Sequence, residues 1–124
     1  FGMLQRGGRI MIVKVSDTKG DVLQPIIRKN LKKGSTMVTD GHGGYRYMEF
    51  QHEALSHDKG EYARGEFNTN SIEGFWAQLK RTISGTHISV SREHLQKYID
   101  EVAFRYMHRD QQDEMFETIL RRVA

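Results

Sequence analysis

The α/β class of the chain is indicated first by the segment Ser35-Thr36-Met37-Val38-Thr39-Asp40-Gly41-His42-Gly43-Gly44. Threonine and valine in its first half favour a short strand. Asp40 follows at the carboxyl end of that strand, where ligands gather in α/β sheets. The glycines that come next let the chain turn away without shielding the carboxylate. The segment therefore predicts a strand that presents an acid to a binding site.

The residues before this segment predict a hairpin and a helix. Two apolar, β-branched runs, residues 1–5 and 9–15, flank a glycine-rich turn and predict two antiparallel strands. Residues 16–18 offer side-chain oxygens that can cap a helix, and apolar residues at helical spacing predict that helix from about residue 20 to residue 32. Gly34 ends it.

The residues after the segment are irregular at first and helical later. We expect a helical turn at residues 45–48, a brief strand at 52–57 and a long surface loop at 58–70. An apolar stripe predicts an amphipathic helix from about residue 71 to residue 85. The stripe consists of Ile72, Phe75, Trp76, Leu79 and Ile83. Further helical regions are predicted from residue 91 and over residues 113–123.

Length and composition limit the class of protein. The chain has 124 residues, so we expect residues 1–124 to form one domain or part of one. With 37% hydrophobic and 28% charged residues, it is expected to fold rather than to be disordered. No apolar run approaches the ~20 residues that cross a bilayer, so no membrane partner is expected. The absence of cysteine excludes disulfides and thiolate metal sites and fits a cytoplasmic location. A net charge of +3 favours phosphate-bearing partners.

Two acids carry the candidate chemistry. Asp40 ends a strand, and Glu73 lies 33 positions later in the first turn of a predicted helix. A strand-end Asp and a helical Glu can share a divalent ion, because carboxylates are the hard oxygen ligands that suit Mg²⁺ or Mn²⁺. Two such ions can activate an attacking oxygen and stabilise a leaving oxygen in phosphoryl transfer. Lys80 lies two helical turns beyond Glu73, on the same face, and can reach a phosphate.

Other interpretations of these residues stay open. Most acids are solvated surface charges, and an acid early in a helix also stabilises the helix dipole. His42, His52 and His57 suggest a zinc site with Asp40, although their spacings match no common zinc pattern. Phe75 and the adjacent Trp76 fit a hydrophobic core better than a base-stacking surface.

A resemblance to a known family adds weight to the two acids. Residues 57–65 (HDKGEYARG) and 68–81 (NTNSIEGFWAQLKR) resemble the bacterial insertion-sequence transposases of the IS1595 group, also called ISXO2-like. The similarity continues through residues 85–87, 90–91, 94–98 and 104–106, and residues 34–36 and 39–40 match upstream. It covers nearly the whole chain, and the combined pattern is more specific than any single tripeptide.

The resemblance implies a ribonuclease H-like α/β fold with a mixed sheet and C-terminal helices, and a DDE-type catalytic site. Asp40 matches the second acid, Glu73 the third and Lys80 the basic residue that follows it. Two Mg²⁺ or Mn²⁺ ions are implied as cofactors. The first acid belongs on an earlier strand, but no acid precedes Asp17, which follows the second strand. We therefore expect the chain to be a C-terminal fragment that is inactive by itself.

The resemblance also implies DNA as the partner, both the transposon ends and the target. The residues expected to contact DNA are His57, Lys59, Arg64, Lys80 and Arg81. A homo-oligomer on DNA is expected, in the bacterial cytoplasm and at the nucleoid. Two alternatives remain: a ribonuclease H-like nuclease without strand transfer, and an inactive DNA-binding remnant.

Overall fold

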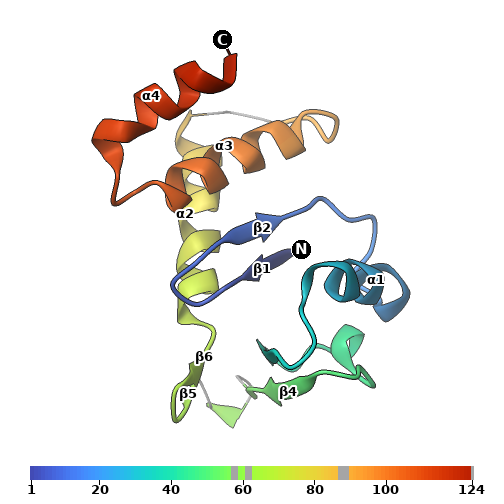
Figure 1. The fold of residues 1–124 in the computed structure, drawn as a ribbon. Helices are drawn as coiled ribbons and strands as arrows, with labels where there is room; N and C mark the ends of the chain where they lie inside the picture. Colours follow the sequence, from blue (N-terminus) through green and yellow to red (C-terminus); the bar gives the residue numbers. More distant parts are fainter. Residues whose placement is uncertain (57–58, 61–62, 87–89, 124) are drawn as a thin grey trace. The chain divides into compact units, whose positions relative to one another are not determined.

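The computed structural model describes residues 1–56, 59–60, 63–86 and 90–123 (Figure 1). Within them, the strands lie before residue 70, and the last three helices follow the strands. The described residues form two compact units. The first unit consists of Phe1 and residues 15–73, and the second consists of residues 2–14 and 74–124. The boundary falls inside one helix, between Glu73 and Gly74.

A pair of parallel strands organises the first unit. Strand β3 (Thr36–Thr39) pairs with β4 (Gln51–Ala54), so that Thr36 faces Gln51 and Thr39 faces Ala54. Helix α1 (Gly20–Asn30) and the short 3-10 helix η1 (Gly43–Tyr45) belong to the same unit. Leu23, Ile27 and Leu55 are buried here. The predicted strand before Asp40 is therefore confirmed, and the predicted helical turn lies two residues earlier than expected.

Helix α1 has the predicted position but not the predicted cap. Its N-terminal flanking residue is Lys19, whose side chain makes no capping hydrogen bond. The Asp17 carboxylate instead accepts the N–H of Thr18, at 2.6 Å. Residues 16–18 lie too far before the first helical residue to cap it. Pro25 lies within the helix and does not break it.

Part of the predicted surface loop is a hairpin. Strands β5 (Ala63–Arg64) and β6 (Phe67–Asn68) pair in antiparallel fashion around a two-residue turn. Gly65 in that turn has φ of 60°, a conformation that favours glycine at the first position of a tight hairpin turn. The expectation of an irregular loop over residues 58–70 was wrong for these residues.

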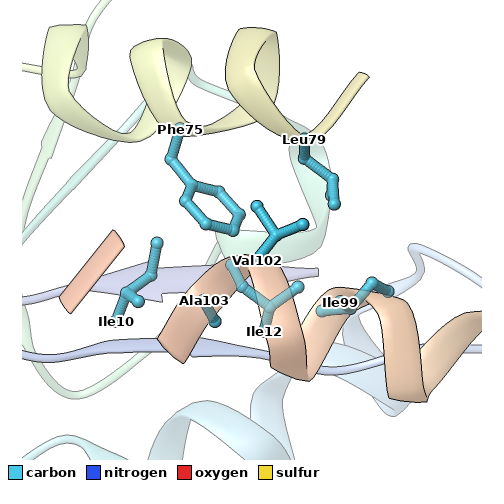
Figure 2. Close-up of a cluster of buried hydrophobic side chains, with 7 residues drawn as sticks. All are labelled: Ile10, Ile12, Phe75, Leu79, Ile99, Val102 and Ala103. Carbon is cyan, nitrogen blue, oxygen red and sulfur yellow. The ribbon is translucent and has the colours of Figure 1, made fainter. Parts of the chain in front are cut away.

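A hairpin and three helices make up the second unit. Strands β1 (Gly2–Leu4) and β2 (Ile10–Ile12) are antiparallel, as predicted. Helix α2 (Asn70–Thr86) continues from the first unit, and helices α3 (Leu95–Met107) and α4 (Gln112–Val123) follow. Figure 2 shows the core, in which side chains of β2, α2 and α3 meet. The buried residues are Ile10, Ile12, Phe75, Leu79, Ile99, Val102 and Ala103.

Strand β2 is also tied to α3 by one polar side chain. The amide of Gln96 donates to the carbonyl of Ile12 at 3.1 Å and accepts the N–H of Lys14 at 2.8 Å. These two bonds satisfy a backbone carbonyl and a backbone N–H that a neighbouring strand would otherwise bind. Gln96 thereby fixes the first turn of α3 against the hairpin.

The fold is α/β, but the expected single mixed sheet is not observed. In the described parts of the chain, the strands pair as three separate two-stranded sheets, β1–β2, β3–β4 and β5–β6. Long-range strand pairing depends on tertiary contacts, which local periodicity does not encode. Among these same residues, no helix is long and apolar enough to cross a membrane.

Candidate active site at the end of strand β3

Asp40 lies directly after β3, as the sequence predicted, and its side chain is exposed. Because β3 and β4 are parallel, this position is the carboxyl end of a parallel strand pair. Gly41 follows with φ of 81°, and its conformation turns the chain away from the strand. The backbone therefore leaves Asp40 open to a ligand.

Two local side-chain hydrogen bonds shape this turn. The Asp40 carboxylate accepts the N–H of His42 at 3.2 Å, and the Thr39 hydroxyl accepts the N–H of Gly41, also at 3.2 Å. The last bond of the strand ladder runs from the N–H of Leu55 to the carbonyl of Thr39, at 2.9 Å. Beyond that bond, the direction of Asp40 depends on side chains rather than on the sheet.

Three rings cluster around Tyr45, which follows the turn. The Tyr45 ring meets the rings of His42 and His52 edge-on, with centroids 5.7 Å and 6.3 Å away, and Phe1 lies at 6.4 Å. Burial raises the pKa of Tyr45, and the negative charge of Asp40 raises it further. The Tyr45 hydroxyl therefore stays protonated beside the acid at neutral pH.

His52 connects β4 to the end of β3. Its Nε2 atom lies 2.8 Å from the Thr39 hydroxyl oxygen, and the ring is partly buried. Burial lowers the pKa of His52 below the ordinary histidine value of 6.5, against the opposing charge of Glu53. The ring is therefore neutral at pH 7, and its Nε2 atom either donates a hydrogen bond to the Thr39 hydroxyl or accepts one from it.

This pKa shift predicts a loss of stability in acid. The unfolded chain takes up a proton on His52 at a higher pH than the folded chain does. The contribution of neutral His52 to the stability of the fold is therefore complete above pH 6.5, and it is lost as the pH falls through the lowered folded-state pKa. We expect His52→Gln to reduce the drop in melting temperature between pH 7.5 and pH 5, because glutamine does not titrate. Equal drops in both proteins would contradict this prediction.

Glu73 lies in the first turn of α2, also as predicted, and it is exposed. Its carboxylate accepts a hydrogen bond from the Thr69 hydroxyl, with 2.5 Å between the two oxygens. Its backbone N–H donates to the Thr69 carbonyl at 3.1 Å. Thr69 is itself buried, with 8% of its surface exposed. The start of the helix thus holds Glu73 by both backbone and side chain. Asp40 and Glu73 belong to the same unit.

The donor chemistry of the two acids suits a hard divalent cation, because both offer carboxylate oxygens that water can reach. Within residues 1–56, 59–60, 63–86 and 90–123, no three acidic or histidine side chains gather as a metal-holding group. Asp40 and Glu73 therefore do not make a complete metal site by themselves, and any ion held by them would need further oxygen ligands. Water and DNA phosphates are oxygen ligands of the required kind.

The predicted DNA-contacting residues differ in their surroundings. Lys80 and Arg81 are exposed on α2, and neither makes an ion pair within the described part of the chain. Lys59 is exposed in a turn. Arg64 is bound to Glu53 at 3.0 Å. His57 lies outside the described residues.

The structure shows what the histidines and the aromatic pair contact. His42 Nδ1 accepts the N–H of Gly44 at 3.1 Å, and His52 bonds Thr39, so both rings serve the turn. Phe75 is fully buried, and Trp76 packs against the same core, which confirms the core interpretation of this pair.

The roles of Thr39, Tyr45 and His52 around Asp40 were not anticipated from the sequence. The sequence suggested His52 only as a zinc ligand and Thr39 only as a strand residue. One signal was available: Thr39 immediately precedes the acid, and threonine hydroxyls often bond the backbone two residues later. The partner of that hydroxyl comes from β4, and only the strand register brings it close.

Comparison with known proteins identifies the family of the chain. Residues 1–107 match the ISXO2-like transposase domain. The chain is also 28% identical, over 101 residues, to an uncharacterized transposase-like protein of Haemophilus influenzae, a match that covers 79% of this chain and 80% of that protein. No solved structure matches the chain. The chain therefore belongs to the ISXO2-like transposase domain family.

Proposed function

We propose that the chain is part of a DDE-type catalytic domain that cuts and joins DNA during transposition of an insertion sequence. One observation carries the proposal: in a member of a transposase family, Asp40 stands exposed at the carboxyl end of a parallel strand pair. Glu73, which matches the third acid of the family pattern, joins Asp40 in the proposed site, and a ribonuclease H-like arrangement of the domain is part of the proposal.

The proposed reaction is two successive phosphoryl transfers. Water attacks a phosphorus atom at the transposon end, the bond to the 3′ oxygen breaks, and a 3′ hydroxyl is released. That hydroxyl then attacks a phosphorus atom of the target, joining the strands and displacing a second 3′ oxygen. Mg²⁺ or Mn²⁺, held by Asp40 and Glu73, would supply charge stabilisation for both transfers. Two carboxylates do not fill the coordination of a divalent ion, so we propose that water and DNA phosphates supply the further oxygens.

The distribution of charge supports DNA as the partner. The second unit carries eleven Lys and Arg residues and seven Asp and Glu residues, whereas the first unit carries eight and nine. Lys80 and Arg81 lie in the positive unit, on the same helix as Glu73. Phosphate contacts by such residues hold DNA without reading its sequence. Target and end recognition, and assembly of several copies on DNA, belong to the same proposal.

The phosphate contacts predict a specific salt dependence. We expect the affinity of residues 1–124 for duplex DNA to fall steeply with salt, because binding releases counterions. Replacing Lys80 and Arg81 together with Gln should weaken binding and reduce the log–log salt slope by about 1 for each phosphate that is no longer neutralised. Fluorescence anisotropy at several NaCl concentrations measures both quantities.

The double variant Lys32→Gln/Lys33→Gln is the matched control. These two residues are also adjacent and exposed, and the change in net charge is the same. An equal effect in both double variants would show that net charge alone governs binding, and would contradict a role for Lys80 and Arg81.

The products formed from transposon-end DNA test the function itself. The protein is incubated with end DNA, target DNA and Mg²⁺, and the strands are resolved on a denaturing gel. Cleaved ends and joined products support the transposase proposal. Cleavage without joining would replace it with a nuclease. DNA binding without either product would replace it with an inactive remnant.

A further inference from the structure

We infer that His52 is a positioning residue for Asp40, and that it acts through the hydroxyl group of Thr39. The inference rests on the proposed role of Asp40 as a metal ligand. It concerns how the acid is held, and not which residues touch the metal or the DNA.

Two hydrogen bonds link His52 to the turn that carries Asp40. His52 Nε2 lies 2.8 Å from the Thr39 hydroxyl oxygen, and that oxygen accepts the N–H of Gly41 at 3.2 Å. Asp40 lies between Thr39 and Gly41 in the chain. The hydroxyl group of Thr39 therefore restrains the backbone on both sides of Asp40, from Thr39 to Gly41.

A free threonine hydroxyl rotates, so the partner of that hydroxyl matters. If Thr39 donates to Nε2, a lone pair remains directed to the N–H of Gly41. If Nε2–H donates, the oxygen accepts both bonds. In either arrangement, His52 fixes the hydroxyl group while it holds the turn. Without His52, water would compete for the same hydroxyl.

His52 is itself held in place from two sides. Strand register sets it opposite Met37, on the face of the sheet that carries Thr39. The Tyr45 ring meets it edge-on at 6.3 Å, with an interplanar angle of 84°. Tyr45 belongs to η1, which begins after His42 and is capped by the His42 ring. The turn that carries Asp40 is thus braced by β4 at one end and by η1 at the other.

The expected consequence is a change in metal affinity. Asp40 is exposed and lies beyond the last bond of the strand ladder, so a loosened turn lets its carboxylate sample more directions. Ordering it on binding then costs more conformational entropy. Residues that orient a metal ligand typically contribute 10–100-fold to affinity, and we expect about tenfold here.

The inference is tested by measuring Mn²⁺ binding to residues 1–124 through the electron paramagnetic resonance signal of the free ion. Thr39→Val keeps the branched shape without the hydroxyl, and His52→Phe keeps a ring without nitrogen. Each should weaken Mn²⁺ binding about tenfold, and the double variant should bind no more weakly than either single one. His52→Gln, whose amide can still bond Thr39, should restore most of the affinity. Asp40→Asn provides the reference for loss of the ligand.

The outcomes separate the inference from the proposed function. If Asp40→Asn binds Mn²⁺ as tightly as the natural sequence does, the metal site itself is wrong. If Asp40→Asn loses binding while Thr39→Val and His52→Phe retain it, the metal site stands and the positioning role is refuted. Additive losses in the double variant would also refute a path through Thr39.

Hydrogen exchange provides a readout that general destabilisation does not reproduce. The amide of Gly41 should exchange faster in His52→Phe and Thr39→Val, while the amide of Leu55, in the neighbouring ladder bond, should be unchanged. Equal acceleration at both amides would indicate loss of the fold rather than of the turn, and would overturn the inference.

Discussion

Replacing Glu73 with Gln is expected to abolish DNA strand cleavage and joining by the natural transposase while DNA binding and folding persist. Glutamine has nearly the same shape, but it lacks the negative charge that a divalent cation requires. Loss of several kcal/mol of charge stabilisation corresponds to a decrease in rate on the order of 10³-fold or more. Strand-transfer assays with labelled transposon-end DNA measure the decrease.

The structure explains why folding should persist in this variant. The contact that Glu73 makes with the Thr69 hydroxyl uses a carboxylate oxygen as acceptor, and the amide oxygen of glutamine can take its place. The exposed Glu93, on the turn before α3, provides the matched control. Glu93→Gln removes the same charge and should leave both reactions unchanged. Retained strand transfer in Glu73→Gln would show that this residue is not the third acid.

The elements predicted correctly are those whose signals are local. The stripe through Phe75 and Leu79 repeats at helical spacing, and both side chains are buried on α2. The glycine turn between residues 5 and 9 specified the first hairpin. Such patterns reflect contacts between near neighbours in sequence, so one sequence is enough to recognise them.

Features that depend on distant partners were missed. The parallel pairing of β3 with β4 brings His52 to Thr39 across 13 positions, and no periodicity encodes that register. The hairpin around Gly65 is a local feature and was missed for another reason: its strands have only two residues, too short for an alternating pattern. Its glycine turn was the available signal.

The candidate site was therefore predicted in part. The positions of Asp40 and Glu73 followed from a strand end and a helix start, both local features. The bracing of Asp40 by Thr39 and His52 is a tertiary property. The resemblance to transposases singled out these two acids as candidates, but the hydrogen bonds around them had to come from the structure.

The core of the second unit leads to the largest stability prediction. Phe75 has 0% of its surface exposed and meets the rings of Trp76 and Tyr106 edge-on, with centroids 5.6 Å and 5.3 Å away. Replacing it with alanine removes this packing and leaves a cavity between α2, α3 and β2 (Figure 2). We expect Phe75→Ala to reduce the free energy of unfolding by about 3–5 kcal/mol. Urea denaturation followed by circular dichroism measures the loss.

Phe116→Ala is the matched control, because it is the same substitution on α4 at a side chain that is 69% exposed. It should change the free energy of unfolding by no more than about 0.5 kcal/mol, since little buried apolar surface is removed. Small domains have only about 5–15 kcal/mol of stability, so the Phe75 variant should unfold at a much lower urea concentration. Similar losses in the two variants would mean that α4 is packed as tightly as α2, and that the core is not the cluster around Phe75.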